Sequence, residues 1–448
     1  MRLKLWMVML CLLMVGTVSA QQNAPVRVVD VVHITDLFPE RTPRIMDMSP
    51  DGTKMVFLRP DALCIYQFES TQQDCIAAPD NLGLSQGIKP EWSPDGRFVA
   101  ITEDPFRRLF ESDIWLLDVE NRTFIHRTDD GVYGSVLRPQ DGNQPIPVDF
   151  SPIWNPVSGD LYFFRIRIAS AEGSRLNDTY VFRIPADQLG TTSEPEEVAF
   201  LSNTLADHAY PVYASNRYGL SGVAAISPDG TRLAFLVRPM QAGHRDEGIW
   251  TLDLESGELE QELYLEEIVP LGMPAYTVEA LQQRDSYGYV LEALDWTSDS
   301  AGLVFNVFDY SFNPALPWLS YHLDLTSGTI TPLADFSDVR DAASMFTIAE
   351  GEAVSPRYDQ MQAMVLLPGE GGFLRGGGDV VLNFNFDNVN QQAGISAIPL
   401  PPTGESPVRL YQFDDFEGPY PMDFYSIGGD GQTYRALLFG YVVTLERE

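Results

Sequence analysis

Few residues of this chain have the types and spacing that catalysis or metal binding requires. No two of its five histidines lie within four residues of each other, so a zinc-binding pair on one helix face is absent. We therefore expect each histidine to have a structural or surface role, while a ligand trio drawn from distant segments stays open. The histidines are His33, His126, His208, His244 and His322.

One Gly-x-Ser-x-Gly sequence, the pattern of a hydrolase nucleophile elbow, occurs at residues 83–87. A nucleophile elbow needs a buried strand before the serine and a helix after it. Here Ala77-Ala78-Pro79 comes before and Pro90 follows, so we interpret Ser85 as a loop serine.

Oxygen ligands gather at one place in the C-terminal quarter of the chain. Asn383, Asn385 and Asp387 alternate with two phenylalanines, so on a strand the three polar side chains would share a face. Ligands of this kind suit calcium, and calcium is the one cofactor that we expect. Because the spacing matches no calcium loop motif, a half-exposed strand is the alternative interpretation.

Tyrosines are frequent in three long connections, residues 129–147, 200–219 and 264–290. Loops on a rigid scaffold often carry function, and exposed tyrosines make low-entropy contacts with a peptide or a sugar. They are equally able to pack over sheet edges. The candidate ligand-binding residues are Tyr133, Tyr210, Tyr213, Tyr218, Tyr276, Tyr287 and Tyr289.

The N-terminus has the features of a signal peptide. Arg2 and Lys4 precede an apolar stretch, residues 5–15, and small residues end at Ala20, as at a signal-peptidase cleavage site. We expect export and cleavage after Ala20, to the periplasm or the cell exterior, with a retained membrane anchor as the alternative. Cys64 and Cys75 then remain, and an oxidising compartment favours a disulfide between them.

Ser-Pro-Asp-Gly occurs three times, at residues 49–52, 93–96 and 227–230, each time before an apolar run. Proline presets φ for a tight turn, aspartate bonds to nearby backbone amides, and glycine accepts a positive φ. The aspartates Asp51, Asp95 and Asp229 are therefore turn formers. Each copy predicts a strand, a turn and a second strand, and such recurrence is typical of repeat architectures.

Weaker copies precede the apolar runs at residues 161–164, 303–305, 361–365 and 436–439. Several copies continue into a third strand that ends in Leu-Asp-aliphatic and then into a short fourth strand. We expect the aspartates of this third strand to brace the hairpin that follows; they are Asp118, Asp253 and Asp324. Four strands per copy is the blade of a β-propeller. We predict an all-β propeller of seven blades, or six if the last two copies merge, in one domain over residues 21–448.

The last copy supplies about two strands, near residues 422–425 and 434–443, before the chain stops. The apolar run at residues 26–34 has no partner of its own. Pairing this run into the last blade would cover open edges at both ends of the chain. We therefore expect the ring to be closed by the N-terminal strand.

The series Ser-Pro-Asp-Gly, apolar strand, then Ile-Trp-x-Leu-Asp resembles the WD-like repeats of the TolB-type β-propeller family, from about Arg44 to Phe439. The resemblance implies the propeller architecture and no particular activity. TolB carries an α/β domain ahead of its propeller, whereas only residues 21–43 separate the signal peptide from the first repeat here. The chain is similar to the propeller portion alone.

The formal net charge of −34 argues against a nucleic acid or an anionic membrane as partner, because attraction to either rests on lysine and arginine. We expect a monomer without membrane insertion. Two functions remain open: a non-catalytic recognition or scaffold protein that binds a protein, peptide or glycan at one face, or a hydrolase or lyase acting on a carbohydrate or lactone. The second would use carboxylates or a divalent metal at the central channel.

Overall fold

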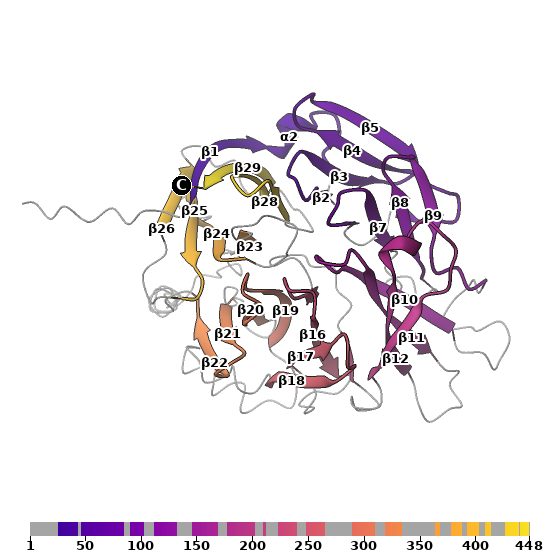
Figure 1. The fold of residues 1–448 in the computed structure, drawn as a ribbon. Helices are drawn as coiled ribbons and strands as arrows, with labels where there is room; N and C mark the ends of the chain where they lie inside the picture. Colours follow the sequence, from indigo (N-terminus) through magenta and orange to yellow (C-terminus); the bar gives the residue numbers. More distant parts are fainter. Residues whose placement is uncertain are drawn as a thin grey trace, which may run out of the picture.

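The chain forms a ring of antiparallel sheets, a β-propeller (Figure 1). A computed structural model describes residues 26–43, 46–84, 90–102, 112–131, 146–168, 177–201, 209–211, 223–239, 248–264, 289–309, 319–333, 363–367, 378–387, 392–402, 408–413, 426–438 and 440–447. Within these ranges the strands form seven sheets, and the helical elements described in full are α2 (Ile34–Leu37) and the 3-10 turn η2 (Ala186–Gln188). No described helix has the length and apolarity needed to cross a bilayer.

Each sheet is one blade, and in six of the seven the four main strands follow chain order from the inside of the ring outward (Figure 1). Blade 1 has β2 (Met46–Met48), β3 (Lys54–Arg59), β4 (Ala62–Gln67) and β5 (Gln72–Ala77). Blade 2 has β6 (Glu91–Trp92), β7 (Phe98–Thr102), β8 (Ile114–Asp118) and β9 (Thr123–His126). Blade 3 has β10 (Ile146–Trp154), β11 (Leu161–Ile168), β12 (Asn177–Ile184) and β13 (Glu196–Phe200).

The next three blades repeat this order. Blade 4 has β15 (Ala224–Ile226), β16 (Arg232–Pro239), β17 (Gly248–Asp253) and β18 (Leu259–Tyr264), and β14 (Ala209–Pro211) also pairs with β16. Blade 5 has β19 (Tyr289–Trp296), β20 (Gly302–Asp309), β21 (Leu319–Asp324) and β22 (Thr329–Pro332). Blade 6 has β23 (Ala363–Leu367), β24 (Val380–Asp387), β25 (Gln392–Pro399) and β26 (Val408–Phe413).

Blade 7 joins the two ends of the chain, as expected. Its strands are β27 (Ser426–Gly429), β28 (Thr433–Leu438), β29 (Tyr441–Arg447) and the N-terminal strand β1 (Val26–His33). β1 pairs antiparallel with β29 from Val26 opposite Arg447 to His33 opposite Tyr441, and the two lie side by side in Figure 1. The C-terminal segment thus supplies three strands rather than two, because the run expected as one long strand turns at Gly440.

The Ser-Pro-Asp-Gly turn is held by its own side chains. Ser49 donates from Oγ to Asp51 Oδ1 at 2.6 Å and accepts from the Lys54 amide at 2.9 Å, while the Thr53 amide donates to Asp51 at 3.0 Å. The turns at Asp95 and Asp229 repeat the pattern. These aspartates are therefore turn formers, as predicted, and the serine locks each turn to the strand that follows.

Tryptophans just before the turn between the first and second strands link neighbouring blades. The indole of Trp92 donates to the Asp47 carbonyl of blade 1 at 3.4 Å, and that of Trp154 donates to the Glu91 carbonyl of blade 2 at 3.1 Å. The Trp296 indole donates to the Ala225 carbonyl at 2.9 Å. Each acceptor lies two residues before the first residue of its own turn, so one contact recurs around the ring.

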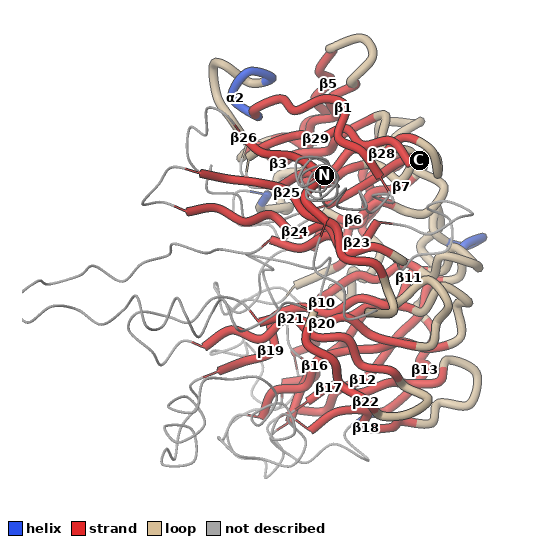
Figure 2. The backbone as a smooth tube through the Cα atoms, turned by 90° about the vertical axis from the view of Figure 1, so that its left-hand side faces the viewer, coloured by secondary structure: helices blue, strands red, loops and turns tan. Residues whose placement is uncertain are grey.

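The turns between first and second strands lie together on one face, here called the turn face. Asn155 donates to the Gly230 carbonyl at 2.9 Å, the Asp229 amide donates to Ser300 Oγ at 3.1 Å, and the Gly429 amide donates to the Pro50 carbonyl at 2.8 Å. Figure 2 shows short described turns along one side of the ring and α2 on the other. On this other face, the connection face, second and fourth strands end and third strands begin.

The apolar core lies between neighbouring blades. One cluster joins Met46 and Phe57 of blade 1 to Leu437 and Val442 of blade 7, and another joins blades 3 and 4. Burial of both sheet faces explains why the second strands, such as β7, are almost continuously apolar. Within blade 1, Cys64 and Cys75 face each other on β4 and β5 with Cα atoms 4.0 Å apart and form the predicted disulfide.

The sixth repeat differs from the expectation. The apolar run at residues 361–365 was predicted to be the second strand of its blade, but β23 (Ala363–Leu367) is the first strand and β24 is the second. The Ser-Pro signal at residues 355–356 therefore lies before the blade and not inside its first hairpin. Periodicity could not separate these two strands because both are apolar.

Candidate functional site

The hairpin of β8 and β9 brings a histidine and two aspartates together on the connection face. Trp115 lies opposite His126 and Asp118 lies opposite Thr123. Continuing this register places Asp113 opposite Thr128, and alternation puts the side chains of Asp113, Trp115, His126 and Thr128 on one face of the hairpin.

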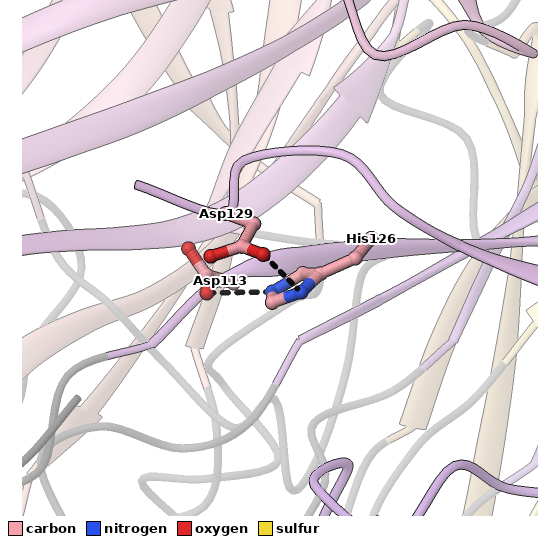
Figure 3. A group of neighbouring side chains, drawn as sticks. All are labelled: Asp113, His126 and Asp129. Atoms are coloured by element: carbon pink, nitrogen blue, oxygen red, sulfur yellow. Dashed lines mark hydrogen bonds and ion pairs between the residues drawn. The ribbon is translucent and has the colours of Figure 1, made fainter. Parts of the chain in front are cut away.

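The imidazole of His126 lies between two carboxylates (Figure 3). Its Nε2 is 2.6 Å from Asp113 Oδ2, and its Nδ1 is 3.4 Å from Asp129 Oδ2. The Asp113 and His126 side chains are only 8% and 15% exposed, whereas Asp129 is 43% exposed. The group is thus open to solvent on the side of Asp129 and covered on the side of Asp113.

Two neighbours hold this group in place. The Trp115 indole stacks on the His126 ring, with centroids 3.9 Å apart and planes 8° from parallel. Thr128 donates from Oγ1 to Asp113 Oδ1 at 3.1 Å and accepts from the Ile114 amide at 2.8 Å. Both ring face and carboxylate are therefore oriented before any ligand arrives.

A buried ion pair of blade 3 lies beside this group. Arg165 donates from Nε and Nη2 to the two Asp149 carboxylate oxygens at 2.6 and 2.7 Å. The Asp149 amide donates to the Ser112 carbonyl at 2.8 Å, which joins β10 to the start of β8. The Asp113 and Asp149 carboxylates are therefore neighbours across the boundary between blades 2 and 3.

Burial raises the pKa of Asp149 to about 6, because desolvation outweighs the hydrogen bonds and charge of Arg165. The negative charge of Asp113 adds to this rise in the Asp149 pKa. Burial lowers the pKa of Arg165, but the Asp149 carboxylate more than offsets it, so that pKa lies above its usual value.

An imidazole between two carboxylates can do two kinds of chemistry. It can hold a proton shared with the carboxylates, as a general acid or base does, or it can supply a nitrogen ligand beside two oxygen ligands. Among the described residues, this is the one group of three histidine, cysteine or acidic side chains whose ligand atoms converge to within 4.8 Å.

The residues singled out in the sequence lie elsewhere. Asn383, Asn385 and Asp387 lie on a strand, β24, as expected, but their side chains are not among the described parts of the structure. Tyr210 and Tyr289 lie on β14 and β19, again with only the backbone described, and Tyr133, Tyr213, Tyr218, Tyr276 and Tyr287 fall outside the described residues. Both sets stay predictions.

Other expectations can be followed into the structure. His322 is buried on β21, which agrees with a structural role, one of the two roles expected of each histidine. Asp118, Asp253 and Asp324 accept from amides of the turns that follow, as predicted for hairpin braces. The predicted signal peptide, residues 1–20, and Ser85 lie outside the described residues, as do His208 and His244.

The Asp113, His126 and Asp129 group could not be recognised from histidine spacing, because it contains a single histidine and no histidine pair close in sequence. The signal that could have found it is the register of the hairpin. The tight turn after Asp118 sets which residues of the third and fourth strands face each other, so Asp113 and His126 are neighbours although thirteen residues separate them.

The protein is thus a β-propeller of four-stranded blades. No family model and no curated protein sequence matches this chain. Among solved structures it is similar to an oligogalacturonate lyase in complex with manganese, with 10% identity, a TM-score of 0.46, and coverage of 90% of this chain and 89% of that one.

Two further similar structures belong to named organisms. A putative TolB from Agrobacterium tumefaciens has 10% identity and a TM-score of 0.36, and the match covers 87% of this chain and 98% of that one. Dipeptidyl peptidase 4 from Porphyromonas gingivalis has 12% identity and a TM-score of 0.41, over 84% and 53%. These likenesses concern the fold alone and carry no ligand or reaction to this chain.

Proposed function

We propose that this protein is an exported, monomeric recognition propeller of the TolB-like repeat type, which binds a protein, peptide or glycan on its connection face. The binding is non-catalytic, and the contact residues are the tyrosines of the three long connections. A nucleic acid or a membrane is not the partner, since the chain carries a formal net charge of −34 and attraction to either rests on lysine and arginine.

The observation that supports this proposal is the strand order. All three tyrosine-rich connections run from the outer strand of one blade to the inner strand of the next. They lead from β9 to β10, from β13 to β15 by way of β14, and from β18 to β19. Connections of this type leave and re-enter on the connection face. The tyrosines that sequence reasoning selected one by one therefore belong to connections that share a face.

The disulfide between Cys64 and Cys75 supports the export part of the proposal. Disulfides persist in oxidising compartments and are rare in the cytosol. Cleavage after Ala20 is tested by N-terminal sequencing of the protein secreted from cells that express the full chain. A mature N-terminus at Gln21 is expected, and an intact Met1 in the membrane fraction would contradict it.

The binding part is tested by screening residues 21–448 against glycan and peptide arrays, followed by titration of the hits. Tyr133→Ala and Tyr276→Ala, in two of the connections, are expected to weaken binding by about 1–3 kcal/mol each, the usual cost of truncating an aromatic contact. Val157→Ser, on the turn face and 63% exposed, is the control. Hits that survive both tyrosine variants and are lost with Val157→Ser would overturn the proposal.

A second candidate function, a hydrolase or lyase acting on a carbohydrate or lactone, is favoured by the His126 imidazole held between two carboxylates. This group lies on the third and fourth strands of blade 2, away from the innermost strand where the channel residues were expected. Turnover of acidic oligosaccharides or lactones that is lost in Asp113→Asn would favour this function over recognition.

A further inference from the structure

The donor atoms of Asp113, His126 and Asp129 lie within 4.8 Å of one another at the open end of one hairpin. We propose that His126, through Nδ1, and Asp129 bind a divalent first-row metal ion, with Zn²⁺ as the representative, while Asp113 holds the other ring nitrogen, Nε2, at 2.6 Å. The proposal goes beyond recognition at the connection face, because it names a site and a ligand that recognition does not require.

The donor set suits such an ion. Imidazole is a good ligand for zinc and its neighbours in the first transition row, whereas Ca²⁺ and Mg²⁺ prefer sites made of oxygen alone. Zn²⁺ takes nitrogen and carboxylate ligands at about 2.0–2.2 Å, which places two ligand atoms about 3.3 Å apart in a tetrahedron. The separation between His126 Nδ1 and Asp129 Oδ2, 3.4 Å, already has this value.

The site is organised before an ion arrives. Trp115 fixes the plane of the His126 ring by stacking on it, and Thr128 fixes one oxygen of Asp113 by a hydrogen bond. Outer hydrogen bonds and packing of this kind hold ligands in metal sites and raise affinity. A mostly buried histidine held by a mostly buried carboxylate also differs from the exposed acidic groups that are common on protein surfaces.

The local charge favours a cation. The carboxylates of Asp113 and Asp129 contact the two nitrogens of the His126 ring, and the nearby Arg165 guanidinium is paired with Asp149 through both carboxylate oxygens. A divalent ion at His126 Nδ1 would place its charge beside the Asp113 and Asp129 carboxylates.

The test is calorimetric titration of the metal-stripped protein with Zn²⁺ at pH 7.5, with metal content measured after dialysis. Asp129→Asn and His126→Gln remove one ligand each. Asp129 is partly exposed, so its variant is expected to fold. Glu120 is an exposed residue at the other end of the same hairpin, so Glu120→Gln removes the same charge without touching the site. Asp387→Asn separately tests the calcium site predicted on β24.

We expect one Zn²⁺ per chain, an affinity at least about tenfold lower in Asp129→Asn and His126→Gln, and no change in Glu120→Gln or Asp387→Asn. Absence of Zn²⁺ binding by the parent protein would overturn the proposal. Equal loss in Glu120→Gln, or retention in both ligand variants, would also overturn it. Array binding by the metal-stripped protein tests the recognition function independently.

Discussion

Replacing Arg165 with methionine would leave a buried carboxylate without its cation. Asp149 is 1% exposed and Arg165 is 9% exposed, and two hydrogen bonds join them. The arginine also lies over the Phe182 ring, 4.7 Å from its centroid, and a methionine keeps most of that packing. The main loss is therefore electrostatic.

The magnitude follows from proton linkage. The folded-state pKa of Asp149, about 6, is above its ordinary value of 3.8, so its contribution to stability is complete below pH 3.8 and is lost as pH rises through 6. Without Arg165, we expect the Asp149 carboxyl to stay protonated in the folded protein. Above pH 6, keeping this proton lowers the free energy of unfolding of the variant, relative to the parent, by about 1.4 kcal/mol per pH unit. The difference is about 3 kcal/mol at pH 8 and almost nothing at pH 5.

The assay is urea unfolding of the parent and Arg165→Met at pH 5 and pH 8. Arg183→Met is the matched control, because Arg183 pairs with Glu196 near the surface and an exposed pair contributes about 1 kcal/mol or less. We expect a deficit for Arg165→Met that grows by about 3 kcal/mol between the two pH values. The reasoning is refuted if the deficit is equal at pH 5 and pH 8, or if adding Asp149→Asn leaves its pH dependence unchanged.

Three further changes test the fold. Replacing both Cys64 and Cys75 by alanine removes a disulfide that spans 11 residues and is expected to lower the free energy of unfolding by about 3 kcal/mol. The unfolding midpoint should fall and no longer respond to reductant, and a variant that still responds would contradict this expectation. Trp296→Phe removes the indole donor to the Ala225 carbonyl and should cost about 1–3 kcal/mol in urea unfolding, whereas an unchanged midpoint would deny the link between blades. Gly428→Ala would place a Cβ 1.9 Å from the Ser49 carbonyl oxygen and should cost about 3 kcal/mol or more. Gly96→Ala meets nothing within 4 Å and strains only a positive φ, for about 1–2 kcal/mol, so equal losses would refute the contact between turns.

The repeat could be predicted because its signals are local. A Ser-Pro-Asp-Gly sequence forms the same turn wherever it occurs, since Ser49, Asp51 and their equivalents bond to each other and to amides within five residues. The assignment was wrong at β23 and β24, because both runs are apolar, and at the C-terminus, where one expected strand is split into β28 and β29. Closure by β1 was also predictable, since an unpaired apolar run at one end needed a partner at the other.

The propeller, its four-stranded blades, the disulfide and the braces at Asp118, Asp253 and Asp324 could all be predicted from the amino-acid sequence. The contacts among Asp113, His126 and Asp129, and the place of Asp149 and Arg165 of the next blade beside them, became visible only in the folded chain. The first meeting depends on hairpin register and the second on the packing of blade 2 against blade 3. Neither leaves a motif, because contacts between side chains of different strands require only a position on each strand and no fixed spacing along the chain.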